Sequence, residues 1–520
     1  MKTRTIILLI AFALLAAGQL QARYYEQGRR HYSRKEYDKA REMFLKAAES
    51  EGSGNAHYFL GEIEKILGNY REAEEHFTTA ISRPNISRQY LINSYWSALV
   101  MAEQRHDHES VVVICRSMWQ RTGDASARQR IDTLINKLLW SNNEEAIAKY
   151  RKGIELKNSG GREAARNAFQ GALALDGSFL APKFELGMAS YNAGDLDRAT
   201  GYLEAIASRI PFYAEVQLVL ADINFRKFNY RGAIGRYDRA LEFGFIDPSA
   251  DYGIRLRRGT SFYNLDDYQG AEKEIDQALI HRPGSVDALL LLSLVKIKMG
   301  KYDDAMKVLK RANAAEPDNP EVHYQIGSVY YRENDGRHID HFEKLFSLTE
   351  AAKDRPSKYT KVFRILAAHH YESKNYRKAV AVLKSLGSGT TDYETRLLLA
   401  KSHYGAKEYD TAIELFEGLS LGSEDRYLLC RAYAAGGRKE KARALLVELS
   451  ALGDYLARAK LDPVLAPLAR EIDKGTTRPE PAPEKERSPV KETEKTAPPA
   501  PEKEIEHPGE TDGESVKKAE

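Results

Sequence analysis

The clearest hydrophobic pattern in the chain lies between residues 286 and 319. In residues 286–298, small and apolar side chains recur every three or four positions, which places them on one side of a helix. Residues 300–302 break this spacing, and residues 305–312 form a second stripe that ends before Pro317. The segment therefore predicts two antiparallel helices with a short turn. Neither helix can bury its apolar side alone, so the unit needs copies of itself on both sides.

The rest of the chain supplies these copies. Two complete copies lie in residues 28–47 and 60–80, a degenerate one lies in residues 87–122, and another, without the alanine, lies in residues 320–357. From residue 146 onward an alanine recurs at one position of the second helix: Ala165, Ala199, Ala233, Ala271, Ala305, Ala379, Ala412 and Ala442. We therefore predict eleven repeats and one degenerate repeat, in an array where each unit contacts only its neighbours.

This spacing resembles the tetratricopeptide repeat, which has a small residue at its eighth position, a tyrosine at the turn, an alanine at its twentieth position and a proline near its end. The resemblance implies an all-α fold in which helix pairs form a right-handed superhelix, or solenoid. It also implies that the first helix of each repeat lines a concave groove, where a peptide segment or a partner protein lies. The small residues at the eighth and twentieth positions are expected to have a packing role, because helices approach closely only where a side chain leaves room.

Composition changes abruptly at both ends of the array. Residues 1–22 combine Lys2 and Arg4 with an apolar run from Ile6 to Ala17, which predicts a secretory signal peptide; the alternative is an uncleaved membrane anchor. Residues 475–520 contain eight of the eighteen prolines, no aromatic residue, and twelve acidic against eight basic residues, which predicts disorder. The expected organisation comprises a signal peptide (1–22), an N-terminal repeat block (23–122), a helical joint (123–145), the main array (146–450), a capping helix (451–474) and the tail (475–520).

Charge and cysteine content exclude some functions. The net charge of +3 is small beside 78 basic and 75 acidic residues, so composition gives no case for nucleic-acid binding. Cys115 and Cys430 lie many repeats apart, so we expect no disulfide between them. No cysteine lies near the expected cleavage region, which excludes a bacterial lipoprotein. The sequence therefore predicts an exported protein of the periplasm or cell envelope.

Two rows of residues are candidates for binding. In the family pattern the twelfth position of each repeat faces the groove, and here it is mostly aromatic: Tyr191, Phe225, Tyr263, Tyr331, Tyr371 and Tyr404. The thirteenth position is polar or basic in five successive repeats: Asn192, Arg226, Asn264, Lys298 and Arg332. The rows would hold a peptide through aromatic anchors and polar contacts. The alternative is that the aromatic residues pack within the fold and that the polar residues stabilise the C-terminal ends of helices through capping and the helix dipole.

No arrangement of catalytic residues, phosphate loop or zinc-ligand spacing occurs, so we predict no enzymatic activity and no cofactor. Two histidine groups, His106 with His108 and His338 with His341, fit solvated surface better than a metal site. The preferred function is a scaffold that binds a peptide segment or partner protein. A self-assembling structural protein and an accessory subunit of a cell-wall-active complex are the alternatives.

Overall fold

The structure, a computed structural model, describes residues 23–49, 53–244, 248–350, 357–387 and 392–476. Within these residues every regular element is an α-helix, so the predicted all-α fold is confirmed. The expected signal peptide and residues 477–520 of the expected tail lie outside the described part. The chain divides into two compact units, Met1–His281 and Arg282–Glu520.

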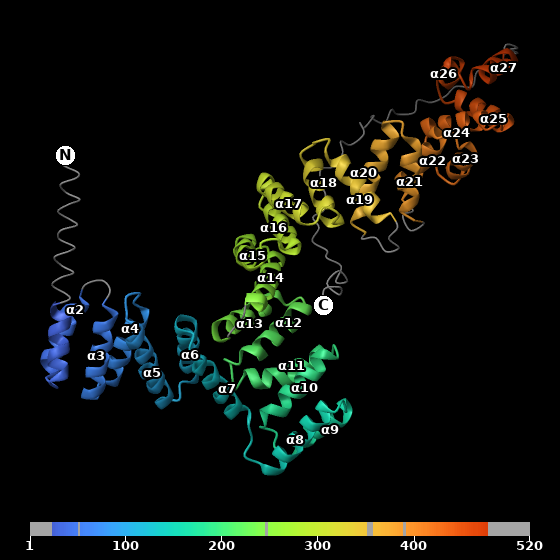
Figure 1. Ribbon diagram of the computed structural model, residues 1–520. Helices are drawn as coiled ribbons and strands as arrows, with labels where there is room; N and C mark the ends of the chain where they lie inside the picture. The colour runs from blue at the N-terminus through green and yellow to red at the C-terminus, as the bar shows by residue number, and fades with distance from the viewer. Residues whose placement is uncertain (1–22, 50–52, 245–247, 351–356, 388–391, 477–520) are drawn as a thin grey trace, which may run out of the picture. The chain divides into compact units, whose positions relative to one another are not determined.

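The described residues of the first unit form seven helical hairpins and one additional helix (Figure 1). In chain order its elements are residues 23–33 with α2 (Tyr37–Ala48), α3 (Gly54–Leu67) with α4 (Tyr70–Ser82), α5 (Arg88–Gln104) with α6 (His108–Thr122), α7 (Ala125–Leu139), α8 (Glu144–Asn158) with α9 (Arg162–Leu175), α10 (Leu180–Asn192) with α11 (Leu196–Ala207), α12 (Ala214–Arg226) with α13 (Tyr230–Phe243), and α14 (Pro248–Asn264) with α15 (Tyr268–His281).

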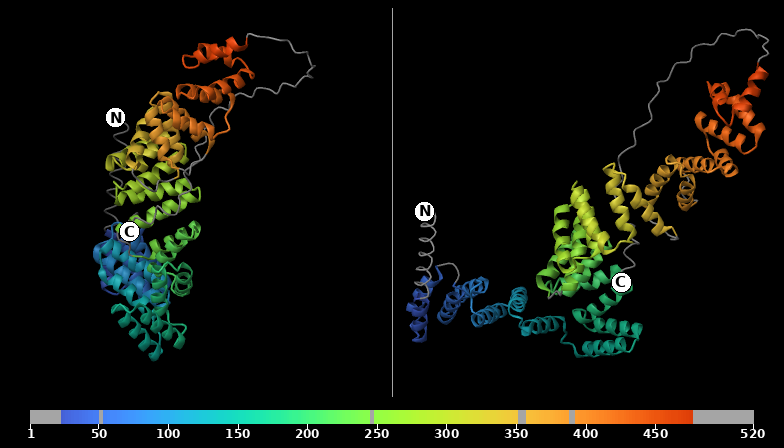
Figure 2. Two further views of the ribbon diagram at one scale, coloured as in Figure 1. Left: turned by 90° about the vertical axis from the view of Figure 1, so that its right-hand side faces the viewer. Right: turned by 45° about the horizontal axis from the view of Figure 1, so that its top comes forward.

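In the second unit, the part that the structure describes contains five hairpins followed by two shorter helices. They are α16 (Val286–Lys298) with α17 (Tyr302–Ala315), α18 (Pro320–Arg332) with α19 (His338–Thr349), α20 (Tyr359–Glu372) with α21 (Tyr376–Ser385), α22 (Tyr393–Gly405) with α23 (Tyr409–Glu417), α24 (Ser423–Ala435) with α25 (Lys439–Ser450), then α26 (Tyr455–Leu461) and α27 (Ala466–Thr476). Figure 2 shows the hairpins of each unit from two further directions. The predicted helix pairs are thus present in the described residues.

The small residue at the eighth position explains why the two helices of a hairpin approach closely. Gly61 of α3 lies against the ring of Phe77 on α4, and a Cβ at residue 61 would stand 2.7 Å from the nearest ring atom. Phe77 is fully buried, so the ring has no room to retreat. Cys430 takes the same position in α24, where it is fully buried and its thiol donates to the Ala442 carbonyl at 3.2 Å. The predicted packing role of the small residues is therefore confirmed.

A residue with left-handed backbone conformation turns the chain between the helices of most hairpins. Gly300, between α16 and α17, has φ +74°, and the next amide, of Lys301, donates to the Lys296 carbonyl at 2.9 Å. Glycine adopts this conformation at no steric cost, and it ends the first helix. Phe228 occupies the corresponding position between α12 and α13 with φ +57° and is largely exposed.

The degenerate third hairpin departs from the expectation that each repeat contacts only its neighbours. Arg116 of α6 donates from Nη1 to the Glu242 carbonyl of α13 at 2.9 Å, and the His108 ring lies 6.3 Å from that of Phe212. Val112 of α6 belongs to the same buried apolar cluster that includes residues of α10 to α13. This hairpin lacks the small-residue positions, so its bulky side chains are covered by helices far along the chain. The expectation of neighbour contacts alone was wrong here.

The segment after the last hairpin forms two helices, where the sequence suggested one capping helix. Asp462 separates them, and its Oδ1 accepts the backbone amides of Val464 at 2.9 Å and Leu465 at 3.4 Å. Leu465 and Ala469 are fully buried in one cluster with residues of α25. The two helices cover apolar side chains of α25, and α27 continues to Thr476, slightly past the expected start of the tail.

Candidate functional site

The aromatic residues at the twelfth position are half-buried, and most pack inside their own hairpin. Five rings lie 5.2–5.9 Å from an aromatic ring at or near the start of the second helix: Phe225 with Tyr230, Tyr263 with Tyr268, Tyr331 with His338, Tyr371 with Tyr376, and Tyr404 with Tyr409. Edge and tilted contacts of this kind contribute to stability beyond the area they bury. The rings therefore have a packing role at the turn of each hairpin, and their role in binding stays a prediction.

Tyr191 contacts the following repeat instead of an aromatic ring of its own hairpin. Its hydroxyl donates to the carboxylate of Asp222 on α12 and accepts from Nη2 of Arg226 at 3.0 Å. The Arg226 guanidinium also lies 4.9 Å from the centre of the Tyr191 ring, a cation–π contact. Burial, and then the hydrogen bond to Asp222, raises the pKa of Tyr191 to about 12, so the hydroxyl keeps its proton at neutral pH.

Asp222 joins three successive first helices at this point. Its Oδ2 pairs with Nε of Arg226 at 2.7 Å, and its Oδ1 lies 3.4 Å from Nε of Arg257 on α14. The Asp222 side chain is only 9% exposed, whereas those of Arg226 and Arg257 are 43% and 50% exposed. One buried carboxylate thus orients two guanidinium groups whose outer N–H groups remain accessible to solvent. Guanidinium groups suit carboxylates and backbone carbonyls, because they present several donors in a fixed plane.

The residues at the thirteenth position do not share one environment. Asn192 and Arg226 are exposed, but Asn264 donates from Nδ2 to the Thr260 carbonyl of its own helix at 2.8 Å. These three residues belong to the first unit, and Lys298 and Arg332 belong to the second. The Arg332 guanidinium lies 4.9 Å from the centre of the Tyr302 ring. The structure therefore brings Arg226 together with Tyr191, gives Asn264 a partner on its own helix, and gives Arg332 a partner on the preceding hairpin.

The second unit has a related cluster near its C-terminal end. The Arg431 guanidinium lies 5.6 Å from the ring of Tyr404, and its Nε pairs with Oδ2 of Asp462 at 2.9 Å. Asp462 is nearly buried, as Asp222 is in the first unit. A tyrosine from one repeat, an arginine from the next and a buried aspartate thus form similar clusters in both units.

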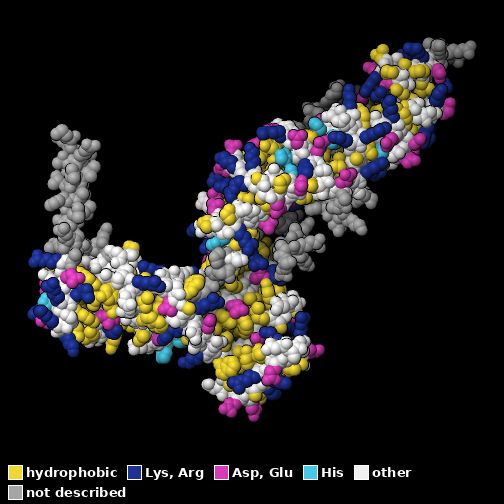
Figure 3. Space-filling view, in the orientation of Figure 1, with side chains coloured by type: hydrophobic (Ala, Val, Ile, Leu, Met, Phe, Trp, Pro, Cys, Tyr) yellow, Lys and Arg dark blue, Asp and Glu magenta, His cyan; other side chains and the backbone are white. Residues whose placement is uncertain are grey.

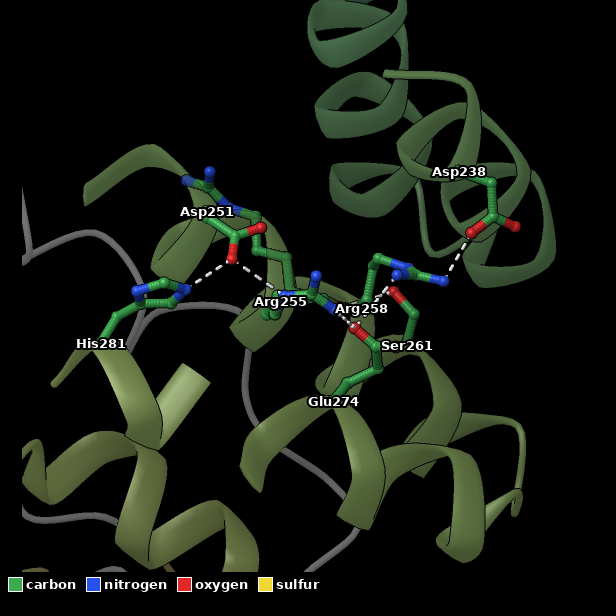
Figure 4. Close-up of polar contacts among 8 residues, drawn as sticks. Asp238, Asp251, Arg255, Arg258, Ser261, Glu274 and His281 are labelled. Carbon is green, nitrogen blue, oxygen red and sulfur yellow. Dashed lines mark hydrogen bonds and ion pairs between the residues drawn. The ribbon is translucent and has the colours of Figure 1, made fainter. Parts of the chain in front are cut away.

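A separate ion-pair network ties α13, α14 and α15 together (Figure 4). Glu274 accepts from Nη1 of Arg255 at 3.1 Å and from Nη1 of Arg258 at 3.0 Å. Arg258 also pairs with Asp238 at 2.5 Å, and Arg255 pairs with Asp251 at 3.0 Å. Glu274 is only 7% exposed, so its carboxylate is neutralised by the two arginines and not by solvent. We assign this network to stability.

Two histidine pairs recur at equivalent places in two hairpins. Nδ1 of His57 lies 3.2 Å from Nδ1 of His76, and Nδ1 of His323 lies 3.0 Å from Nδ1 of His341. These distances fit a hydrogen bond, which requires one ring nitrogen to carry a proton and the other to accept it. Among the described residues no group of three or more His, Cys, Asp or Glu side chains could hold a metal ion.

The first histidine pair stays neutral because it is half-buried. Burial, then repulsion from His76 and Arg83, lowers the pKa of His57 to about 4. The sequence had grouped His341 with His338, but the His338 ring lies instead against the Asp335 carbonyl at 2.6 Å. The observed partner, His323, is in the other helix of the hairpin, so spacing along one helix could not identify it.

Sequence reasoning also missed Asp222, Arg257 and Arg431. It considered the twelfth and thirteenth positions only. Asp222 lies three residues before Phe225, and residues three or four apart share one side of a helix. The signal available in the sequence was therefore a charged residue three positions before the twelfth position of a repeat, on the same side of the first helix.

The remaining described surface is mixed in charge. Figure 3 shows Lys and Arg side chains interspersed with Asp and Glu over the face in view. None of the described helices combines the length and apolar character that crossing a membrane requires.

Comparison with known proteins identifies the repeats. Family models described as tetratricopeptide repeat match residues 25–87, 150–214, 184–251 and 265–325. A rhomboid protease, GluP from Bacillus subtilis (strain 168), is 24% identical over 94 residues, which is 18% of this chain and 18% of that protein. The chain thus matches only a small part of that relative.

Solved structures with similar folds include several repeat proteins. Yeast Tom70 is 17% identical, with 87% of this chain and 99% of that chain covered and a TM-score of 0.30. YrrB, a TPR protein with an unusual peptide-binding site, is 17% identical, with 40% and 99% covered and a TM-score of 0.32. A tetratricopeptide repeat protein from Parabacteroides merdae is also 17% identical, with 50% and 99% covered and a TM-score of 0.34. The identification of tetratricopeptide repeats therefore depends on the family-model matches and on the observed helical hairpins.

Proposed function

This chain belongs to the tetratricopeptide-repeat family, and we propose that it is a non-enzymatic scaffold that binds a peptide segment or partner protein along its first helices. Proteins of this family are generally protein-interaction scaffolds. The observation that carries the proposal is the cluster of Tyr191, Asp222, Arg226 and Arg257. It joins three successive first helices and leaves two oriented guanidinium groups accessible.

The cluster supports binding because its arginines are positioned before any partner arrives. Asp222 holds both guanidinium groups, and Tyr191 fixes that of Arg226 from a second side. Preorganised side chains lose less conformational entropy on binding than mobile ones. The partner group that fits best is a carboxylate or a row of backbone carbonyls, since both accept several N–H donors. The half-buried aromatics beside the cluster would then add apolar contact.

The experiment places a photoreactive residue in the full chain at Asn192, beside the cluster, and separately at Lys273 on the second helix α15. Both positions are exposed, so both report on accessible surface. We expect a defined protein adduct from position 192, and loss of that adduct when Arg226 and Arg257 are changed to alanine. Identical adducts from both positions, or adducts unaffected by the arginine changes, would refute binding at this surface.

We further propose that the protein acts in the cell envelope. The support is sequence alone, namely the positive start and the apolar run within residues 1–22. Fractionation of cells that express the full chain, beside a chain lacking residues 1–22, tests this proposal. The full chain should appear in the envelope or periplasm, and the truncated chain should remain in the cytoplasm. Equal distribution of the two chains would refute it.

A further inference from the structure

An arginine-lined hollow lies on the second helices of the first unit. Its walls come from α11, α13 and the loop after α11, and its volume is about 450 Å³. The lining residues are Glu204, Ala207, Ser208, Pro211, Arg231, Gly232, Gly235, Arg236 and Arg239. Three arginines face one acidic residue, so the lining has a net charge of +2. A volume of this size is within the range of small-ligand sites.

Arg236 is held rigidly at one side of the hollow. Its Nη2 contacts both carboxylate oxygens of Glu204, at 2.7 and 2.6 Å, and its Nη1 donates to Oε1 of Gln217 at 2.8 Å. Gln217 is fully buried, and its Nε2 donates to the Pro211 carbonyl at 2.7 Å, which fixes the orientation of the amide. The Glu204 charge is thus used by Arg236, and the excess positive charge belongs to the other two arginines.

Arg231 and Arg239 are both exposed, and within the described part of the chain neither side chain has an ion-pair or hydrogen-bond partner. They lie eight residues apart on α13, with Gly235 halfway between them, so all three share one side of the helix. At 1.5 Å per residue, the two arginines start about 12 Å apart along the axis. Both side chains carry a positive charge, so an anion placed between them would be attracted by both.

Gly235 lies between the two arginines on α13. It lies inside α13, where glycine costs about 1 kcal/mol relative to alanine. A Cβ at Gly235 would meet no atom within 4 Å, so packing does not require a glycine there. This differs from Gly61, whose absent Cβ makes room for Phe77. Gly235 thus leaves the surface between the two arginines free of a side chain.

We propose that this hollow binds a phosphate group, carried either by a soluble small molecule or by a lipid headgroup. A phosphate dianion offers more oxygen acceptors and more charge than a carboxylate, and therefore suits two separate guanidinium groups. The site lies on second helices, away from the Tyr191 cluster on first helices. The inference is therefore independent of the proposed scaffold function.

The soluble arm of the test titrates the full chain with inorganic pyrophosphate at low ionic strength by calorimetry. We expect saturable binding that weakens about tenfold or more in the Arg231→Ala/Arg239→Ala variant, because two charge-assisted contacts are lost. The matched control is Arg151→Ala/Arg162→Ala, which removes two exposed arginines of the same unit that have no ion-pair partner among the described residues. It should bind as the wild type does. Equal weakening in both variants would show general charge attraction and overturn the proposal.

A variant that keeps the charge tests the space itself. Gly235→Leu should fill the hollow and weaken pyrophosphate binding about tenfold while circular dichroism stays unchanged, since nothing in the fold occupies that space. Unchanged affinity in this variant would overturn the proposal.

The lipid arm uses vesicles of phosphatidylcholine with and without phosphatidic acid. Binding to phosphatidic acid alone, lost in the Arg231/Arg239 variant, assigns the phosphate to a lipid headgroup. Binding to pyrophosphate but not to vesicles assigns it to a soluble molecule. Binding to neither probe, or succinate binding as tight as that of pyrophosphate, would overturn the inference.

Discussion

Replacement of Gly61 by alanine tests whether the small residue at the eighth position is a steric requirement. The added methyl group would stand 2.7–2.9 Å from three atoms of the Phe77 ring, which is fully buried and cannot move into solvent. Overpacking of this kind lowers the free energy of unfolding by about 1–3 kcal/mol, whereas the higher helix propensity of alanine raises it by about 1 kcal/mol. We therefore expect a net destabilisation of about 1 kcal/mol in the α3/α4 hairpin.

The matched control is Gly235→Ala, because it makes the same chemical change inside a helix of the same unit without a steric conflict. It should stabilise its hairpin by about 1 kcal/mol. Hydrogen exchange of the amides in α3/α4 and α12/α13 measures both effects locally, which matters because an array of repeats need not unfold in one step. Urea unfolding followed by circular dichroism provides the global comparison.

A second substitution should rescue the first. In the α20/α21 hairpin the eighth position is Ala367, and its partner is the smaller Leu383, with both side chains buried. Gly61→Ala combined with Phe77→Leu should therefore recover stability relative to the sum of the single changes, with a coupling of about 1 kcal/mol. If Gly61→Ala stabilised the protein as Gly235→Ala does, or if the double variant showed no coupling, the steric argument would be wrong.

Two further predictions concern charge. Stability should fall as the pH drops from 6.5 toward 4, because the unfolded chain then binds a proton that the folded state excludes from His57. The loss in unfolding free energy is on the order of 3 kcal/mol at most. Urea midpoints of His57→Gln should depend less on pH than those of the wild type, and an equal pH dependence would contradict the prediction. Glu274→Ala should lower the unfolding free energy by about 3 kcal/mol, because Arg255 and Arg258 lose a nearly buried partner. The control Glu163→Ala removes an exposed ion pair and should change the unfolding free energy by less than about 1 kcal/mol. Similar losses in the two variants would contradict the assignment of the network to stability.

Position in the repeat predicts the helix on which a candidate binding residue lies, but not the residue that it contacts. The repeat register placed Tyr191 and Arg226 on first helices, and the structure brings them together. The register could not show that Tyr263 packs against Tyr268 of its own hairpin. Both tyrosines occupy the twelfth position, so only the neighbouring side chains distinguish an internal contact from a contact between repeats.

The sequence by itself determined the paired helices of the array and the number of hairpins in the described residues, although not the two helices that follow the last hairpin. These features depend on contacts within about 34 residues, and the spacing of apolar and small side chains repeats often enough to be read directly. Only the tertiary structure decided which polar groups meet: Asp222 with Arg226 and Arg257, His57 with His76, and Arg116 with the carbonyl of Glu242. Such contacts join different helices, and their partners depend on rotation and packing that no single repeat specifies.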